Sequence, residues 1–81
     1  MQATKISDDR DIYSIAYENS TGEGNVTATF TNQENGDKSS RKAFDDGDLT
    51  VTVAKGWSGT DDVTIVHDDG TELDSGEVTF G

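Results

Sequence analysis

Apolar residues alternate with threonine along residues 25–31, and this period of two limits the fold of the chain more than any other feature. Val26, Ala28 and Phe30 share one face of such a segment, while the threonines between them share the other. Alternation of this kind indicates a β-strand with one buried face and one solvent-facing face. Residues 25–31 are therefore expected to form a strand that covers a core.

The same alternation recurs at short intervals and defines most of the remaining strands. It appears at residues 12–17, 49–54 and 63–67. The pair Asp69-Gly70 is typical of a tight hairpin, and it leads into a last strand that ends near Phe80. Lys38–Phe44 lacks alternation, and it fits either a short strand or a single helical turn with Phe44 anchored in the core.

Short strands at regular spacing, separated by turn residues, are typical of an all-β sandwich or barrel. We expect a small immunoglobulin-like β-sandwich, with a small antiparallel β-barrel as the alternative. Residues 1–10 are polar and are expected to form an N-terminal arm, and residues 11–81 to form a single domain. The expected core residues, drawn from two facing sheets, are Phe30, Val51, Val53, Ile65, Val78 and Phe80.

A two-residue turn at Asp69-Gly70 predicts the register of the last hairpin. It sets Ile65 opposite Asp74 and Val66 opposite Leu73. Val66 and Leu73 then lie on the face turned away from the core, where an apolar cluster marks a contact with another protein.

Composition leaves this small domain with few ways to gain stability. Only 30% of the 81 residues are apolar, there is no cysteine, and His67 is the single histidine. Disulfides and multi-histidine metal sites are therefore excluded within one chain. Small domains with thin cores gain stability from self-association or from docking on a larger protein, and we expect one or both here.

Acidic clusters provide a candidate cation site. Asp45, Asp46 and Asp48 surround a glycine in a turn-rich segment, and Ca²⁺ binds convergent carboxylate oxygens. The spacing does not match an EF-hand loop, so the alternatives are a weak Ca²⁺ site and a set of solvated acids. No other cofactor is expected.

His67 lies beside Asp68 and Asp69, the residue types of a general base oriented by a carboxylate. The chain has no cysteine, and its serines show no nucleophile-elbow pattern. We interpret His67 as a surface residue at the end of a strand, and we expect the protein not to be an enzyme.

The formal net charge of −11 is large for a chain of this length. Nucleic-acid phosphates and anionic lipids repel such a surface, so neither nucleic acid nor a membrane is expected as a partner. Aspartate outnumbers glutamate and lysine is sparse, which favours adaptation to high salt over docking on a basic partner or mimicry of nucleic acid.

Half of the six basic residues fall within one short segment, 38–44. These side chains either pair with acids next to them in sequence (Asp37, Asp45 and Asp46) or meet an acidic neighbour, which is a second copy or an acidic shell. We favour the acidic neighbour. The candidate interface residues are Lys38, Arg41, Lys42, Trp57, Val66 and Leu73.

The stretch DLTVTVAKGWSGTDDVTIVHDDGTELDSGEVTF, residues 48–80, resembles the last three strands of prokaryotic and viral immunoglobulin-like domains. The similarity rests on a strand followed by Gly-Trp-Ser-Gly-Thr, a second alternating strand, an Asp-Gly turn and a final strand rich in Gly, Thr and Val. The paired cysteines of antibody-type domains, with a tryptophan between them, are missing. The resemblance implies a sandwich domain of the kind found in cell-surface proteins and in the heads and tails of tailed viruses.

Together, these features lead to one expected function and two alternatives. The Asp-rich composition is similar to that of proteins from halophilic archaea and their viruses. We expect a virion structural protein of a virus that infects a halophile (a capsid decoration, turret or tail accessory subunit), made in the host cytoplasm and bound to itself or to a larger capsid or tail protein. The alternatives are an immunoglobulin-like adhesive module of an extracellular cell-surface protein, and an acidic inhibitor or DNA mimic.

Overall fold

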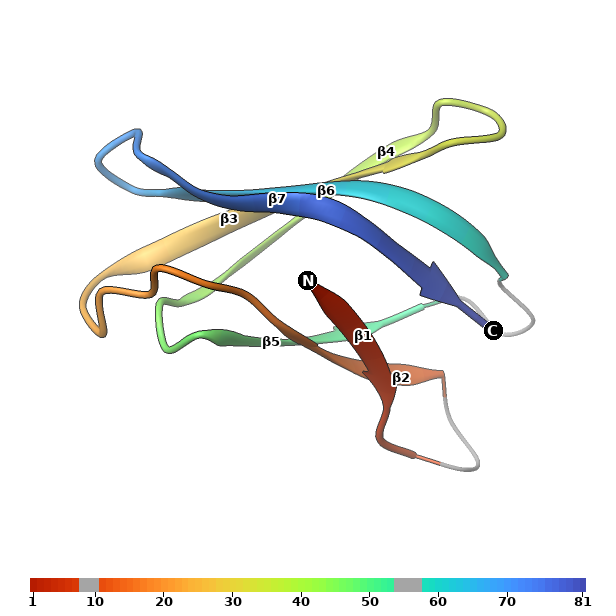
Figure 1. The fold of residues 1–81 in the computed structure, drawn as a ribbon, viewed down its shortest axis with the longest axis horizontal. Coiled ribbons are helices and arrows are strands. Elements are labelled where there is room, and N and C mark those ends of the chain that lie inside the picture. The colour runs from red at the N-terminus through yellow and green to blue at the C-terminus, as the bar shows by residue number, and fades with distance from the viewer. Residues whose placement is uncertain (8–10, 54–57) are drawn as a thin grey trace.

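The computed structural model describes residues 1–7, 11–53 and 58–81, and these form seven strands in two sheets (Figure 1). The strands are β1 (Gln2–Lys5), β2 (Ile12–Ala16), β3 (Asn25–Asn32), β4 (Lys38–Phe44), β5 (Asp48–Thr52), β6 (Gly59–His67) and β7 (Glu72–Phe80). One sheet has the order β1-β2-β5 and the other the order β4-β3-β6-β7, and every pairing is antiparallel.

The two sheets pack face to face, which confirms the predicted all-β sandwich (Figure 1). The barrel alternative is wrong, because the described strands form two separate sheets and not one closed sheet. The segment that fitted either a strand or a helical turn is the edge strand β4. The described part of the chain contains no helix that could cross a membrane.

The core lies between the sheets and follows the predicted alternation. Val26, Ala28 and Phe30 point inward from β3, and Leu49 and Val51 point inward from β5. Of the six expected core residues, Val53 is only partly buried and the other five are buried. Aromatic packing joins the two sheets, since the rings of Tyr13 and Phe80 meet edge to face with centroids 5.0 Å apart.

Phe44 does not anchor β4 in the core, and its side chain is 54% exposed. The register explains this, because Phe44 pairs with Asn25, whose neighbour Val26 is the residue that points inward. Cross-strand partners share a face of the sheet. The β4 residues on the core side are therefore the partners of Val26, Ala28 and Phe30, which are Ala43, Arg41 and Ser39.

The turn between β6 and β7 encloses three residues, 68–70, between the hydrogen-bonded residues His67 and Thr71, and not the two expected. The amide of Gly70 donates to the carbonyl of His67 at 2.8 Å, and the amide of His67 donates to the carbonyl of Thr71 at 2.8 Å. Gly70 has a φ of 91°, and loops of three residues commonly place a glycine in this left-handed region.

A β-bulge follows in β7 and corrects the predicted outer-face pair. Ile65 pairs with Asp74 as expected, but Val66 pairs with Glu72. Leu73 is the extra residue of the bulge, and it is buried in the core while Val66 is half-buried. The prediction that Leu73 lies with Val66 on an exposed face is wrong, because the bulge inverts the side-chain parity of the strand.

The segment expected as an N-terminal arm contributes a strand. β1 pairs with β2 from Gln2 opposite Ala16 to Lys5 opposite Tyr13. Met1 and Ala3 pack against the core. β1 also contacts β7. Met1, just before β1, lies close to β7 as well, since a Cβ at Gly76 would be 3.4 Å from the Met1 Cβ.

Candidate functional site

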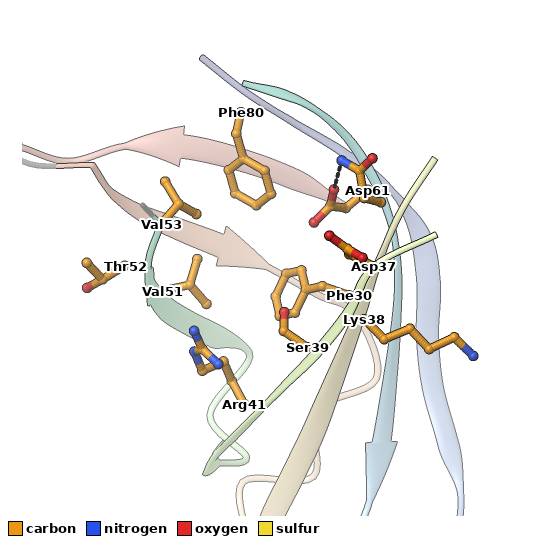
Figure 2. A pocket seen from close by; sticks show the side chains of 11 residues that line it. Phe30, Asp37, Lys38, Ser39, Arg41, Val51, Thr52, Val53, Asp61 and Phe80 are labelled. Atoms are coloured by element: carbon orange, nitrogen blue, oxygen red, sulfur yellow. Dashed lines mark hydrogen bonds between the residues drawn. The ribbon is translucent and has the colours of Figure 1, made fainter. Parts of the chain in front are cut away.

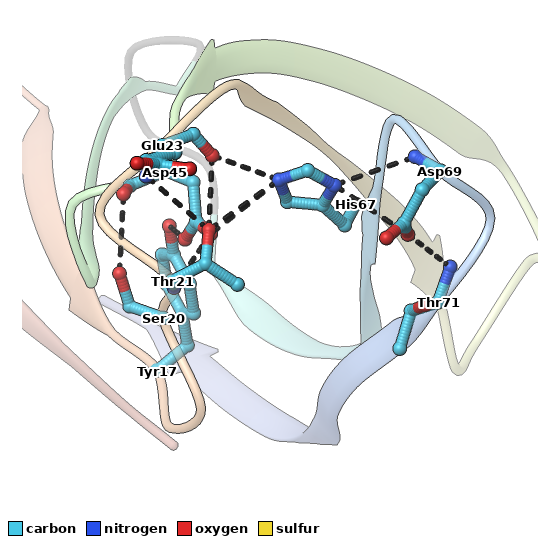
Figure 3. A network of polar contacts seen from close by, with 8 residues as sticks. All are labelled: Tyr17, Ser20, Thr21, Glu23, Asp45, His67, Asp69 and Thr71. Atoms are coloured by element: carbon cyan, nitrogen blue, oxygen red, sulfur yellow. Dashed lines mark hydrogen bonds and ion pairs between the residues drawn. The ribbon is translucent and has the colours of Figure 1, made fainter.

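A polar network ties three loops together at one end of the sandwich (Figure 3). Its centre is Asp45, which is fully buried in the turn between β4 and β5. The hydroxyl of Tyr17 donates to Asp45 Oδ1 at 2.7 Å. The amide and hydroxyl of Thr21 donate to Asp45 Oδ2 at 2.8 and 2.6 Å. One carboxylate thus holds the loop between β2 and β3 against the β4–β5 turn.

These contacts set the ionisation states within the network. Burial opposes a charge on Asp45, but hydrogen bonds donated by Thr21 and Tyr17 outweigh it and hold the pKa of this carboxyl well below its usual range. Burial, together with the hydrogen bond to Asp45, raises the pKa of Tyr17 to about 12. Asp45 is therefore anionic and Tyr17 neutral near pH 7.

His67 closes the network from the end of β6. Its Nε2 lies 2.8 Å from the carbonyl oxygen of Glu23 and 3.8 Å from Asp45 Oδ2, and its Nδ1 lies 3.4 Å from Asp69 Oδ1. The hydrogen bond to Glu23 raises the pKa of His67, burial opposes this, and the charges of Asp69 and Asp45 add to the rise.

In this geometry His67 is not placed to act as a base on the nearest hydroxyl. Thr21 Oγ1 lies 3.5 Å from His67 Nε2, but the Thr21 hydroxyl donates its proton to Asp45. The Glu23 carbonyl only accepts, so Nε2 carries a hydrogen and has no lone pair for a second proton. The network is therefore a structural tie between loops.

The three aspartates of the candidate Ca²⁺ site have separate partners. Asp45 is engaged by Tyr17 and Thr21, as described above. Asp46 Oδ1 accepts from the amide of Asp48 at 3.0 Å, and Asp48 Oδ1 accepts from the hydroxyl of Ser14. Residues 1–7, 11–53 and 58–81 hold no group of three or more acidic, histidine or cysteine residues arranged to bind a metal ion.

The basic segment forms the free edge of the four-stranded sheet. β4 is the last strand of that sheet, pairs with β3 alone among the described strands, and carries Lys38, Arg41 and Lys42 without any acidic residue. The local pairing considered from the sequence does not occur. Lys42 Nζ lies 3.6 Å from Asp68 Oδ1, and neither Lys38 nor Arg41 forms an ion pair with a described carboxylate.

A cleft of about 240 Å³ runs beside this edge, on the core side of β4 (Figure 2). Its apolar lining comes from Phe30, Val51, Val53 and Phe80, and β4 contributes Ser39, Arg41 and, at its first position, Lys38. Figure 2 shows Arg41 extending from β4 towards Val51, while Lys38 points away from the cleft. Arg41 therefore occupies a core-side position in an opening between the sheets.

The far end of the cleft is acidic. Asp61 is buried there and accepts a hydrogen bond from Asn32 Nδ2 at 3.2 Å, and Asp37 also lines the cleft. The cleft was missed from the sequence because it depends on how the two sheets meet. No sequence signal marked the cleft, because the position of Arg41 opposite the inward-facing Ala28 is known only once the register is known.

Of the other three interface candidates, the structure describes Val66 and Leu73. Trp57 lies outside the described residues. Val66 is half-buried on the outer face of the sheet and Leu73 is in the core. Among the candidates, Lys38, Arg41 and Lys42 are thus the residues that the structure brings together, on one exposed strand edge.

The fold and this edge define a class: a small antiparallel β-sandwich with a basic free strand beside an open apolar cleft. Comparisons with protein-family models, curated proteins and solved structures give no match to the chain. The function is therefore argued from the geometry.

Proposed function

We propose that the protein is a non-enzymatic structural subunit that attaches to a larger, acidic protein assembly through β4. One observation carries this proposal. On a chain with a net charge of −11, the free edge strand has only positive charges, and two of its three cations have no described carboxylate partner. A local charge of opposite sign fixes where and in which orientation an acidic partner docks.

High salt suits this mode of attachment. In dilute buffer two acidic proteins repel each other over about 10 Å at 0.1 M salt, and this range falls to about 3 Å at 1 M. Ion pairs between β4 and a carboxylate form at about 4 Å or less, so salt weakens them less than it weakens repulsion between charges that lie farther apart. Molar salt thus suppresses the long-range repulsion more strongly than the short-range attraction.

A virus particle of a halophile is the assembly that we propose, with the domain as a capsid decoration, turret or tail accessory subunit. The small all-β fold, the acidic surface and a histidine engaged in structural hydrogen bonds support such a role. Virion accessory subunits need a rigid domain and a docking edge, and they need no reaction centre.

Fractionation of a producing culture tests the proposal. Particles and cell envelopes would be separated on a density gradient in molar salt, and an antibody would locate the protein. We expect it in the particle band, and we expect the double reversal Arg41→Glu and Lys42→Glu to lower its occupancy while the purified variant stays folded. Lys5→Glu, on β1 of the other sheet, is the control and should leave occupancy unchanged. Recovery with the cell envelope would instead identify an adhesive surface module and contradict the proposal.

A further inference from the structure

We propose that the β4 edge binds an extended, acidic segment of the partner by strand addition, and that the cleft beside it receives an apolar side chain of that segment. This inference deepens the proposed function, because it names the partner segment that meets the same strand. Strand addition gains affinity from main-chain hydrogen bonds, and pockets for alternate side chains give it specificity.

The length and exposure of β4 suit it to strand addition. The two sheets leave four edge strands, of which β1 has 4 residues and β5 has 5. β7 is longer, but Met1 lies against it at Gly76. β4 has 7 residues, and all but one of them are exposed. A free edge of this length presents unpaired amides and carbonyls, which are a template for another strand.

The register fixes what an added strand would meet. Side chains of an added strand opposite Ser39 and Arg41 would point to the core side, where the cleft opens. Those opposite Lys38, Ser40 and Lys42 would lie on the outer face. The partner segment therefore needs a period of two, with a different chemistry on each face.

The size of the cleft favours a side chain over a free small molecule. Sites for drug-sized ligands have volumes of about 300–1,000 Å³. This cleft has about 240 Å³, and Phe30, Val51 and Phe80 give it an apolar lining. An aromatic or branched aliphatic side chain on the inner face of the added strand would cover that lining and remove it from water.

Charge selects the remaining positions. Glutamate or aspartate opposite Lys38 and Lys42 forms favourable cross-strand pairs. An acid two positions from the apolar residue, on the same inner face, meets the Arg41 guanidinium. Another copy of β4 would place like charges opposite one another and be repelled. Lysines on an edge strand also serve simply to prevent pairing, and that role alone is the outcome that would overturn the proposal.

Selection from a phage-displayed library of random 12-residue peptides, against the full chain in molar KCl, tests the inference. We expect enriched peptides in which acids alternate with other residues and one inner-face position is aromatic or aliphatic. Amide chemical shifts of the bound domain should change along 38–44. Three outcomes would show that the lysines of β4 only prevent strand pairing. These are enriched peptides without this alternation, shifts confined to other strands, and no enrichment at all.

Variants then separate the two parts of the proposal. Arg41→Glu should weaken binding of the best peptide by roughly tenfold, while the matched reversal Lys5→Glu should not. Ser39→Trp fills the cleft from an exposed position and should also weaken binding by about tenfold, the loss of one buried apolar side chain. Unchanged affinity in Arg41→Glu and Ser39→Trp would contradict both parts.

A scan of single backbone N-methyl groups along the peptide reports on the main chain directly. Strand pairing predicts loss of binding at every second position, because only alternate amides face β4. Equal effects at all positions would rule out strand addition. These results are independent of particle fractionation. If β4 binds peptides but the protein is absent from particles, the virion role alone is rejected. If the protein is in particles but β4 binds no peptide, strand addition alone is rejected.

Discussion

At the scale of single residues, the Asp45 network shows how a thin core is supplemented. Asp45 appeared in the sequence as one acid of a solvated cluster or a cation ligand, because its neighbours in sequence are also acids. Its partners Tyr17 and Thr21 lie 28 and 24 residues away in the chain, a distance over which no spacing rule applies. The sequence therefore could not predict that this aspartate is buried.

Asp45→Asn should lower stability, and the loss should depend on pH. The pKa of Asp45 lies below its ordinary value of 3.8 in the folded protein, so its charge stabilises the fold fully above that value. The stabilisation is lost as the pH falls through the lower, folded-state pKa. Melting temperatures at pH 7 and near pH 3 should show a smaller gap between wild type and variant in acid. A gap that is the same at both pH values would contradict the ionised state of Asp45.

The stability loss in His67→Gln should depend on pH in the opposite direction. The pKa of His67 is raised above its ordinary value of 6.5, so its protonation stabilises the fold fully below that value and is lost as the pH rises through the folded pKa. The difference in melting temperature between wild type and variant should be larger near pH 5.5 than near pH 9. The imidazole shift measured by NMR across the same range supplies the folded pKa. A gap that widens in alkali would reject the assigned contacts.

At the scale of elements, period-two alternation predicted most of the sheet but not its irregularities. Residues 25–31, 49–52 and 63–67 lie in strands. The bulge at Leu73 escaped prediction. Its carbonyl accepts a hydrogen bond from Asn19 Nδ2 at 2.7 Å, and no local pattern reveals a partner 54 residues away. The parity of Phe44 and Arg41 on β4 was hidden for the same reason, since only pairing with β3 sets it.

Leu73→Ala and Val66→Ala distinguish the bulged register from the regular one. Leu73 is buried, so truncating it should cost about 2–5 kcal/mol of the free energy of unfolding. Val66 is half-buried on the outer face, and its truncation should cost less than about 1 kcal/mol. Chemical denaturation in molar KCl measures both. Equal costs would show that Leu73 lies with Val66 on the exposed face and that the bulge is absent.

At the scale of the whole molecule, the charge of −11 opposes the compact state, and the fold must form against it. The melting temperature should therefore rise steeply between about 0.1 M and 1 M KCl, where the screening length falls from about 10 Å to about 3 Å. CaCl₂ at equal ionic strength is the control that separates screening from specific binding. A melting temperature independent of KCl would reject adaptation to salt.

The central claim is that β4 is the docking edge, and amide hydrogen exchange tests it most directly. Exchange would be followed by mass spectrometry in the free domain and in the domain bound to purified particles. The account predicts that residues 38–44 gain protection on binding, since their free amides would pair with the partner, while residues 72–80 of β7 exchange at the same rate in both states. Exchange at 38–44 that is as fast in the bound domain as in the free one would contradict it.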